Sequence, residues 1–141
     1  MKLAEDLRAK QRLYSENGQQ YSFVRAVCSD GTLAVLLFRM QEALSTWRLP
    51  LLALIPHMLN KWLNGCVIGV HARFGSGLVL IHPVGVVINS SVVGGRNVRI
   101  ESGVVIGDNR GQSPRVEDDV FIGSGAKVIG GLKVSRGGRI G

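Results

Sequence analysis

Three histidines are the side chains of this sequence that exchange protons most readily near neutral pH: His57, His71 and His82. His82 lies inside the apolar stretch GLVLIHPVGVVIN and is followed by Pro83. A residue before proline favours an extended conformation, so His82 is predicted at a corner where its imidazole can reach a groove. There it could act as a general base that removes a proton from a hydroxyl group. The alternative is a structural histidine, hydrogen bonded to a neighbouring segment.

The other two histidines and both cysteines fit structural roles. His71 is predicted to be an exposed corner residue, and His57 to be a structural residue of an apolar helix. Cys28 and Cys66 show no metal-ligand spacing, so the sequence predicts no metal site. Two cysteines that serve as small apolar residues are typical of a protein of the reducing cytoplasm.

The second half of the chain repeats every six residues. Of thirteen positions spaced six apart, twelve hold Ile, Leu, Val or Phe, and the exception, Arg110, lies in the turn-forming stretch DNRGQSP. Neither a helix nor an alternating strand has this period, whereas a solenoid with three short strands in a coil of roughly eighteen residues has it. The repeat residues are therefore predicted to face a narrow interior: Ile68, Phe74, Leu80, Val86, Val92, Val98, Val104, Val116, Ile122, Val128, Val134 and Ile140.

Composition divides the chain near residue 65. Of the nineteen glycines only Gly18 and Gly31 precede that point, whereas of the aromatic residues only Phe74 and Phe121 follow it. The glycines suit the corners of a solenoid, and the first part has the helix formers and apolar spacing of helices over 2–13, 22–31, 32–47 and 49–64. The prediction is an α+β chain with a helical domain over 1–64 and a parallel β-helix over 65–141, with a loop at 108–114.

Two apolar features of the first part are predicted to be buried. Leu33, Leu36, Leu37, Met40 and Leu44 form one helical stripe that is expected to face the core. The segment from Leu49 to Leu63 is too short to span a bilayer comfortably and is interrupted by prolines and Lys61. It is expected to be a buried helix at a subunit contact, and weak membrane contact is the alternative.

The net charge of +7 is spread along the chain. Residues before 65 carry eight Lys and Arg against five Asp and Glu, and the later residues carry nine against five, so there is no basic tail. An anionic ligand or surface is compatible with this balance. Nucleic acid is not expected, because the glycine-rich half has no basic stripe interleaved with aromatic residues.

The stretch from Gly65 to Val134 resembles the hexapeptide-repeat acyltransferases, and most of all the serine O-acetyltransferase family. The resemblance rests on GSGLVLIHPVGVVIN, a loop that ends at Pro114, and VFIGSGAKVIGG. It implies a left-handed parallel β-helix and direct transfer of an acetyl group from acetyl-CoA, as a co-substrate, to the hydroxyl of L-serine. The product, O-acetylserine, would feed cysteine synthesis in the cytoplasm. The resemblance also implies a homotrimer or a hexamer of paired trimers, with active sites between subunits.

The same resemblance assigns roles to individual residues. It makes His82 the catalytic base, and it makes Glu101, Asp108 and Ser113 candidates for binding the acceptor. It places the acetyl-CoA groove along IGSGAKVIGG, where small residues let the pantetheine arm lie against the backbone. The residues of this groove are Gly123, Ser124, Gly125, Ala126, Lys127 and Gly130.

Several positions differ from the family pattern. Val67 stands where an acidic residue commonly orients the histidine, Ile81 where an aspartate contacts the substrate, and Gln112-Ser113 where a basic pair precedes the loop proline. Two other hypotheses therefore stay open: an acetyltransferase for a sugar or surface polysaccharide, and a non-catalytic β-helix that binds or scaffolds. The sequence stops in mid-repeat at Gly141, which predicts an open edge, covered by a partner subunit or left by a shortened coil.

Overall fold

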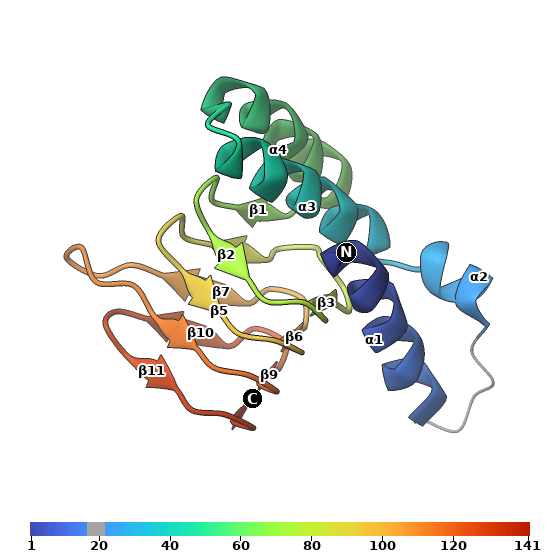
Figure 1. Cartoon of the computed structure of the whole chain (residues 1–141). Helices are drawn as coiled ribbons and strands as arrows, with labels where there is room; N and C mark the ends of the chain where they lie inside the picture. The colour runs from blue at the N-terminus through green and yellow to red at the C-terminus, as the bar shows by residue number, and fades with distance from the viewer. Residues whose placement is uncertain (17–21) are drawn as a thin grey trace.

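The computed structural model describes residues 1–16 and 22–141, so Gly18, between the first two predicted helices, lies outside the described residues. Four helices come first in this described part: α1 (Lys2–Glu16), α2 (Phe23–Val27), α3 (Thr32–Thr46) and α4 (Pro50–Asn64). Twelve short strands follow and coil into a parallel β-solenoid of about four turns, with the helices at one end (Figure 1). The predicted architecture of helices followed by a β-solenoid is confirmed.

The strands form three parallel sheets, one for each side of the solenoid. Sheet A contains β1 (Val67–Ile68), β4 (Val87–Ile88), β7 (Val105–Gly107) and β10 (Lys127–Ile129). Sheet B contains β2 (Arg73–Phe74), β5 (Val93–Gly94), β8 (Arg115–Val116) and β11 (Lys133–Val134). Sheet C contains β3 (Val79–Leu80), β6 (Arg99–Ile100), β9 (Phe121–Ile122) and β12 (Arg139–Ile140).

The strand register shows that two corners carry extra residues. Val67 pairs with Val87, twenty residues on, and Val87 pairs with Val105, eighteen residues on. Val105 pairs with Lys127, twenty-two residues on. The two extra residues of the first coil lie between β3 and β4, at the corner that holds His82, and the four extra residues lie in the loop between β7 and β8.

Because of these insertions, the predicted six-residue repeat is out of phase with the strands between residues 80 and 116. Two and four extra residues together make one full repeat, so the spacing looks unbroken in the sequence. Val86, Val92, Val98 and Val104 are buried, as predicted, but each ends a turn just before a strand. The strand residues that face the interior in these coils are Ile88, Gly94, Ile100 and Ile106.

Gly94 is an interior position without a side chain because Phe74 fills its space. A Cβ atom on Gly94 would lie 2.1 Å from the Phe74 ring. The same ring packs edge-on against Phe38 of α3, with centroids 5.9 Å apart. This aromatic pair joins the first coil to the helices, in a core whose other side chains are aliphatic except for Cys66.

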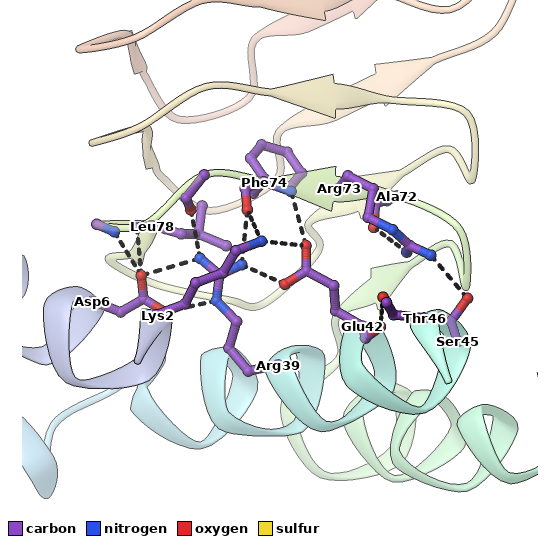
Figure 2. A network of polar contacts seen from close by, with 12 residues as sticks. Lys2, Asp6, Arg39, Glu42, Ser45, Thr46, Ala72, Arg73, Phe74 and Leu78 are labelled. Atoms are coloured by element: carbon purple, nitrogen blue, oxygen red, sulfur yellow. Dashed lines mark hydrogen bonds and ion pairs between the residues drawn. The ribbon is translucent and has the colours of Figure 1, made fainter. Parts of the chain in front are cut away.

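Helices α1 and α3 complete the hydrogen bonds of the first coil, whose strands are the edges of the three sheets (Figure 2). Arg39 donates to the carbonyl oxygens of Phe74 (3.0 Å) and Gly75 (2.6 Å). Asp6 accepts from the backbone N–H groups of Gly77 (2.7 Å) and Leu78 (2.9 Å). An unpaired sheet edge can recruit other strands, and these buried side chains occupy it instead.

The predicted burial of the α3 stripe is wrong, and α4 is largely exposed within the chain, so its predicted subunit contact stays a prediction. On α4 only Ala53, Pro56 and Asn60 are buried, and the helix continues through Pro56. On α3, Leu37 is buried but Leu33, Leu36 and Met40 are exposed, because the core side of the helix is rotated toward Ala34 and Phe38. Among residues 1–16 and 22–141, no helix has the length and apolar character needed to cross a bilayer.

Candidate functional site

The corner that joins sheet C to sheet A, which we call the His82 edge, is built on a column of glycines. Gly65, Gly85, Gly103 and Gly125 occupy it in successive coils, with φ angles of +59°, +75°, +67° and +75°. Such angles are strained for residues that carry a Cβ atom. The backbone N–H of Gly103 donates to Val84, and that of Gly125 to Ser102, so the corners stack in register. The result is a corner column with little side-chain bulk.

His82 protrudes from the top of this edge and faces Asp30. Its side chain is 55% exposed, and its Nδ1 atom lies 3.4 Å from Oδ2 of Asp30. If the Nδ1–H group faces the carboxylate, the Nε2 lone pair is free to accept a proton. The structure therefore gives the imidazole an orienting carboxylate and an available basic nitrogen.

The segment before α3 is held close to β3, and this contact positions Asp30. A Cβ atom on Gly31 would lie 1.9 Å from the carbonyl oxygen of Leu80, two residues before His82. Lys10 of α1 donates to the carbonyl oxygen of Asp30 and to Oγ1 of Thr32 (2.9 Å). Burial lowers the pKa of Lys10 to about 8, against the opposing attraction of Asp30. Neither Asp30 nor Thr32 caps α3, because the N-cap is Gly31.

A cavity of about 480 Å³ opens beside His82 and Asp30. Its apolar wall comes from α3, α4 and the His82 corner, through Leu33, Leu63 and Val84. Cys28 also lines it and is exposed, contrary to its predicted role as a small apolar residue, whereas Cys66 is buried. Burial raises the pKa of Cys66 to about 12, so that thiol is a structural group.

Most of the predicted groove residues lie on the His82 edge, below the histidine. Glu101 and Ser102 occupy the corner one coil down, and Ser124 and Gly125 the next. Ser124 Oγ donates to Glu101 Oε2 (3.4 Å), and Ser102 Oγ donates to Ser124 Oγ (3.4 Å). Neighbouring strands lie about 4.8 Å apart, so His82 and Ser124 are separated by roughly 10 Å along the solenoid. The set of predicted groove residues on this edge is Gly123, Ser124, Gly125, Ala126 and Lys127.

The remaining predicted residues lie at a different corner. Asp108 and Ser113 belong to the loop that joins sheet A to sheet B, where Ser113 Oγ donates to Asp108 (3.4 Å). Gly130 lies at the same corner in the next coil, with its N–H donating to Gly107 (3.0 Å). Within one chain, the structure does not bring these three residues to His82.

The other two histidines have structural contacts. His57 Nδ1 lies 2.9 Å from the carbonyl oxygen of Ile68 and links α4 to the first strand. His71 is exposed at its corner, with Nδ1 3.3 Å from Ser45 Oγ. Within residues 1–16 and 22–141, no group of three or more His, Cys, Asp or Glu side chains is arranged to hold a metal ion.

Comparison with known proteins identifies the family. The serine acetyltransferase of Synechococcus elongatus is 33% identical over 119 residues, which cover 82% of this chain and 49% of that protein. The serine acetyltransferase of Helicobacter pylori is 34% identical over 115 residues, which cover 79% of this chain and 67% of that protein. The chain belongs to the serine acetyltransferase family. No protein-family model matches the sequence.

Solved serine acetyltransferases share the fold of this family member. One in complex with CoA superposes with a TM-score of 0.88 at 25% identity, over 99% of this chain and 58% of that chain. The soybean serine acetyltransferase complexed with serine has a TM-score of 0.85 at 30% identity, over 98% of this chain and 58% of that chain. The chain spans about half to two thirds of the length of these relatives.

The sequence did not single out Asp30 as a partner of the candidate base in this serine acetyltransferase homologue. Val67, at the position expected to hold a carboxylate, is a half-buried residue of β1 paired with Val87. Asp30 is more than fifty residues from His82 in sequence. Its position before a glycine that starts a helix is a common capping pattern, so the local sequence held no signal for this contact.

We expect Asp30→Asn to lower kcat for acetyl transfer roughly tenfold to a hundredfold, because the amide no longer stabilises an imidazolium at His82. The KM for acetyl-CoA and the unfolding temperature should stay unchanged, since Asp30 is exposed. Steady-state kinetics beside thermal unfolding measure both effects. Glu16→Gln, at an exposed carboxylate on α1, is the matched control. A kcat equal to that of the unsubstituted protein would show that Asp30 does not orient the base.

Proposed function

We propose that this protein is an acetyl-CoA-dependent O-acetyltransferase that transfers an acetyl group to the hydroxyl of L-serine. The observation that carries the proposal is His82, paired with Asp30 at the top of the same glycine edge that holds the predicted acetyl-CoA groove. Membership of the serine acetyltransferase family supports the acceptor. The product would be O-acetylserine, a precursor for cysteine synthesis in the cytoplasm.

In the proposed reaction His82 acts as the general base. Its Nε2 atom takes the proton of the acceptor hydroxyl while the oxygen attacks the thioester carbon of acetyl-CoA. The imidazolium that forms is stabilised by the Asp30 carboxylate. The tetrahedral intermediate then collapses, the carbon–sulfur bond breaks, and the leaving thiolate of CoA takes the proton back from His82. No covalent enzyme intermediate is needed, so neither cysteine takes part in the proposed reaction.

The glycine edge below His82 is the proposed site of the pantetheine arm. At Gly125 no atom lies within 4 Å of where a Cβ atom would be, so the backbone is open to a ligand there. Lys127 is exposed just after this corner and can approach a phosphate of the cofactor. The exposed backbone of a positive-φ corner offers the hydrogen bonds that an amide-containing arm requires.

A homotrimer would complete this site in a way that one chain cannot. Asp108 and Ser113 lie at the corner between sheets A and B, whereas His82 lies at the corner between sheets C and A. In a threefold arrangement of parallel solenoids, the loop of one copy can face the His82 edge of the next. We propose that the acceptor binds there, between the loop of one subunit and the His82 cavity of its neighbour.

Acetylation of a sugar is a second candidate function, because two acidic positions of the family pattern are apolar in this chain. Val67 and Ile81 are apolar where the family pattern has acidic residues, and Leu33, Leu63 and Val84 line the cavity. Thiol release from acetyl-CoA should be compared for L-serine and a panel of sugars. A higher kcat/KM with L-serine supports the first function, and turnover with sugars alone supports the second. Failure of every acceptor, together with no binding of acetyl-CoA, would favour a non-catalytic solenoid.

The proposed groove leads to a prediction for Gly125→Ala. The positive φ should destabilise the variant by about 1–2 kcal/mol, and the new methyl group should raise the KM for acetyl-CoA. Gly137→Ala is a matched control, because Gly137 has a φ of +71° and equally open space but lies at the corner between sheets B and C. Denaturant unfolding should show similar losses of stability for both variants. An equal rise in KM for both would contradict the proposed position of the groove.

A further inference from the structure

The outward face of α4 has no role in the proposed acetyl transfer, yet it is apolar. Ala53, Pro56 and Asn60 form the buried side of the helix. The opposite side carries Leu51, Ile55 and Trp62, with exposed fractions of 79%, 59% and 70%. A surface helix normally presents polar residues to water, and a helix that is apolar on all sides is normally covered. This face is therefore expected to have a partner.

The surroundings of the face are positively charged. No Asp or Glu occurs from residue 43 to residue 100. The only carboxylate of α3 and α4 is Glu42, which is buried and paired with Arg39 and Lys2. Arg48, before the start of α4, and Lys61, near its end, are both exposed. A partner of this face would meet cations at both ends of the helix and no exposed carboxylate on it.

The two tryptophans of the chain lie near the two ends of α4. Trp47 follows α3 and comes just before α4, and Trp62 lies in the last turn of α4. Each is 70% exposed. The indole ring is apolar with one polar N–H group, and this makes it favourable at the boundary between water and lipid headgroups.

From these features we propose that the outward face of α4 docks on an anionic lipid surface. The helix would lie in the plane of the headgroups, with Leu51, Ile55 and Trp62 inserted and Arg48 and Lys61 facing anionic lipids. A second copy of the chain fits less well. A helix of fifteen residues is about 22 Å long and about 10 Å wide, which offers far less than the ~800 Å² per partner that a stable protein interface buries.

Docking would place the His82 cavity close to the membrane. Leu63 belongs to the last turn of α4 and also lines this cavity, beside Val84 of the His82 corner. Both side chains are well exposed, at 63% and 67%. Docking of α4 on lipid is a binding event that does not depend on acetyl transfer.

The test uses the full chain and vesicles of phosphatidylglycerol and phosphatidylcholine in equal parts. We expect the protein to float with these vesicles, to bind vesicles of phosphatidylcholine alone at least tenfold more weakly, and to dissociate as salt is raised. Tryptophan emission should shift to the blue on binding, because Trp47 and Trp62 are the only tryptophans of the chain. No binding to the anionic vesicles would overturn the proposal.

Matched variants locate the binding surface. Ile55→Glu should weaken binding at least tenfold, and Arg48→Gln with Lys61→Gln should remove the preference for anionic lipid. Val24→Glu, at a 70% exposed valine on α2, should bind like the unsubstituted protein. Unfolding temperature and light scattering check folding and oligomeric state. Equal vesicle binding by Ile55→Glu, or loss of an oligomer without loss of vesicle binding, would show that α4 meets a different partner.

Discussion

Replacing His82 with alanine is expected to lower kcat/KM for acetyl transfer by roughly a hundredfold to ten-thousandfold, the usual contribution of a positioned general base. The loss should appear mainly in kcat, because the imidazole acts on the proton that moves in the transition state. The free energy of unfolding should hardly change, since the His82 side chain is 55% exposed and its ion-pair partner is the exposed carboxylate of Asp30. Steady-state kinetics with acetyl-CoA and thermal unfolding measure the two effects separately.

His71→Ala is the matched control for this substitution. His71 is also an exposed corner histidine of the first coil, but it contacts Ser45 and is not among the residues that line the His82 cavity. It should keep the rate of the unsubstituted protein. An unchanged rate for both alanine variants would show that His82 is not the base, and an equal loss for both would point to a general effect of disturbing the first coil.

Replacing Asp6 with alanine is expected to reduce the free energy of unfolding by about 3 kcal/mol, because it removes one of the two carboxylates paired with the buried Arg39. Asp6 binds Arg39 through both carboxylate oxygens, at 2.8 and 3.1 Å, and accepts the N–H groups of Gly77 and Leu78 (Figure 2). Burial disfavours the charge on Arg39, but Asp6 and Glu42 outweigh this effect and raise the pKa of Arg39. The variant would also leave two backbone groups at the solenoid edge unpaired.

Denaturant unfolding measures this loss, and Asp118→Ala provides the comparison. Asp118 also pairs with arginines, Arg96 and Arg136, and accepts a backbone N–H group, but it does so at the surface of the solenoid. Surface ion pairs contribute little, so this control should remain close to the unsubstituted protein. Similar effects of the two substitutions would contradict the assignment of the Asp6–Arg39–Glu42 cluster as the cap of the solenoid.

The solenoid could be predicted from the sequence because its signal is repeated many times. A six-residue spacing of aliphatic residues over more than seventy positions has few other structural explanations. The prediction was wrong only about which residues of the repeat fall in the strands between residues 80 and 116. The two-residue insertion at the His82 corner and the four-residue insertion at the loop together restore the repeat, so spacing alone could not detect either. Pairing of Val67 with Val87 reveals the first insertion directly.

Burial of the helices could be predicted less well, because apolar character does not say which side of a helix meets the core. The stripe of leucines on α3 and the whole of α4 read as core residues, yet Leu36, Met40 and Leu51 are exposed. The face of α3 that is buried instead carries Ala34, Phe38 and Gln41, which fit closely against the first coil. Small and polar residues give a weak hydrophobic signal even where their packing is tight.

For the candidate site, the sequence singled out the candidate base, His82, but not its neighbour Asp30. His82 could be chosen because a histidine before proline in an apolar repeat is unusual and matches the family motif. Asp30 belongs to the predicted helical domain, whereas His82 belongs to the β-helix. Only the close approach of Gly31 to Leu80 brings Asp30 to the imidazole. Contacts of this kind depend on how the helices cap the coil, and no local pattern encodes them.

The central claim, acetyl transfer at the His82 edge, is tested most directly by the mass of the acceptor after incubation with acetyl-CoA and the protein. We predict that L-serine gains one acetyl group in amounts that match the CoA thiol released, and that His82→Ala abolishes this gain while His71→Ala does not. Absence of an acetylated product from L-serine and from every sugar offered would contradict the account, as would an equal yield from the His82→Ala variant.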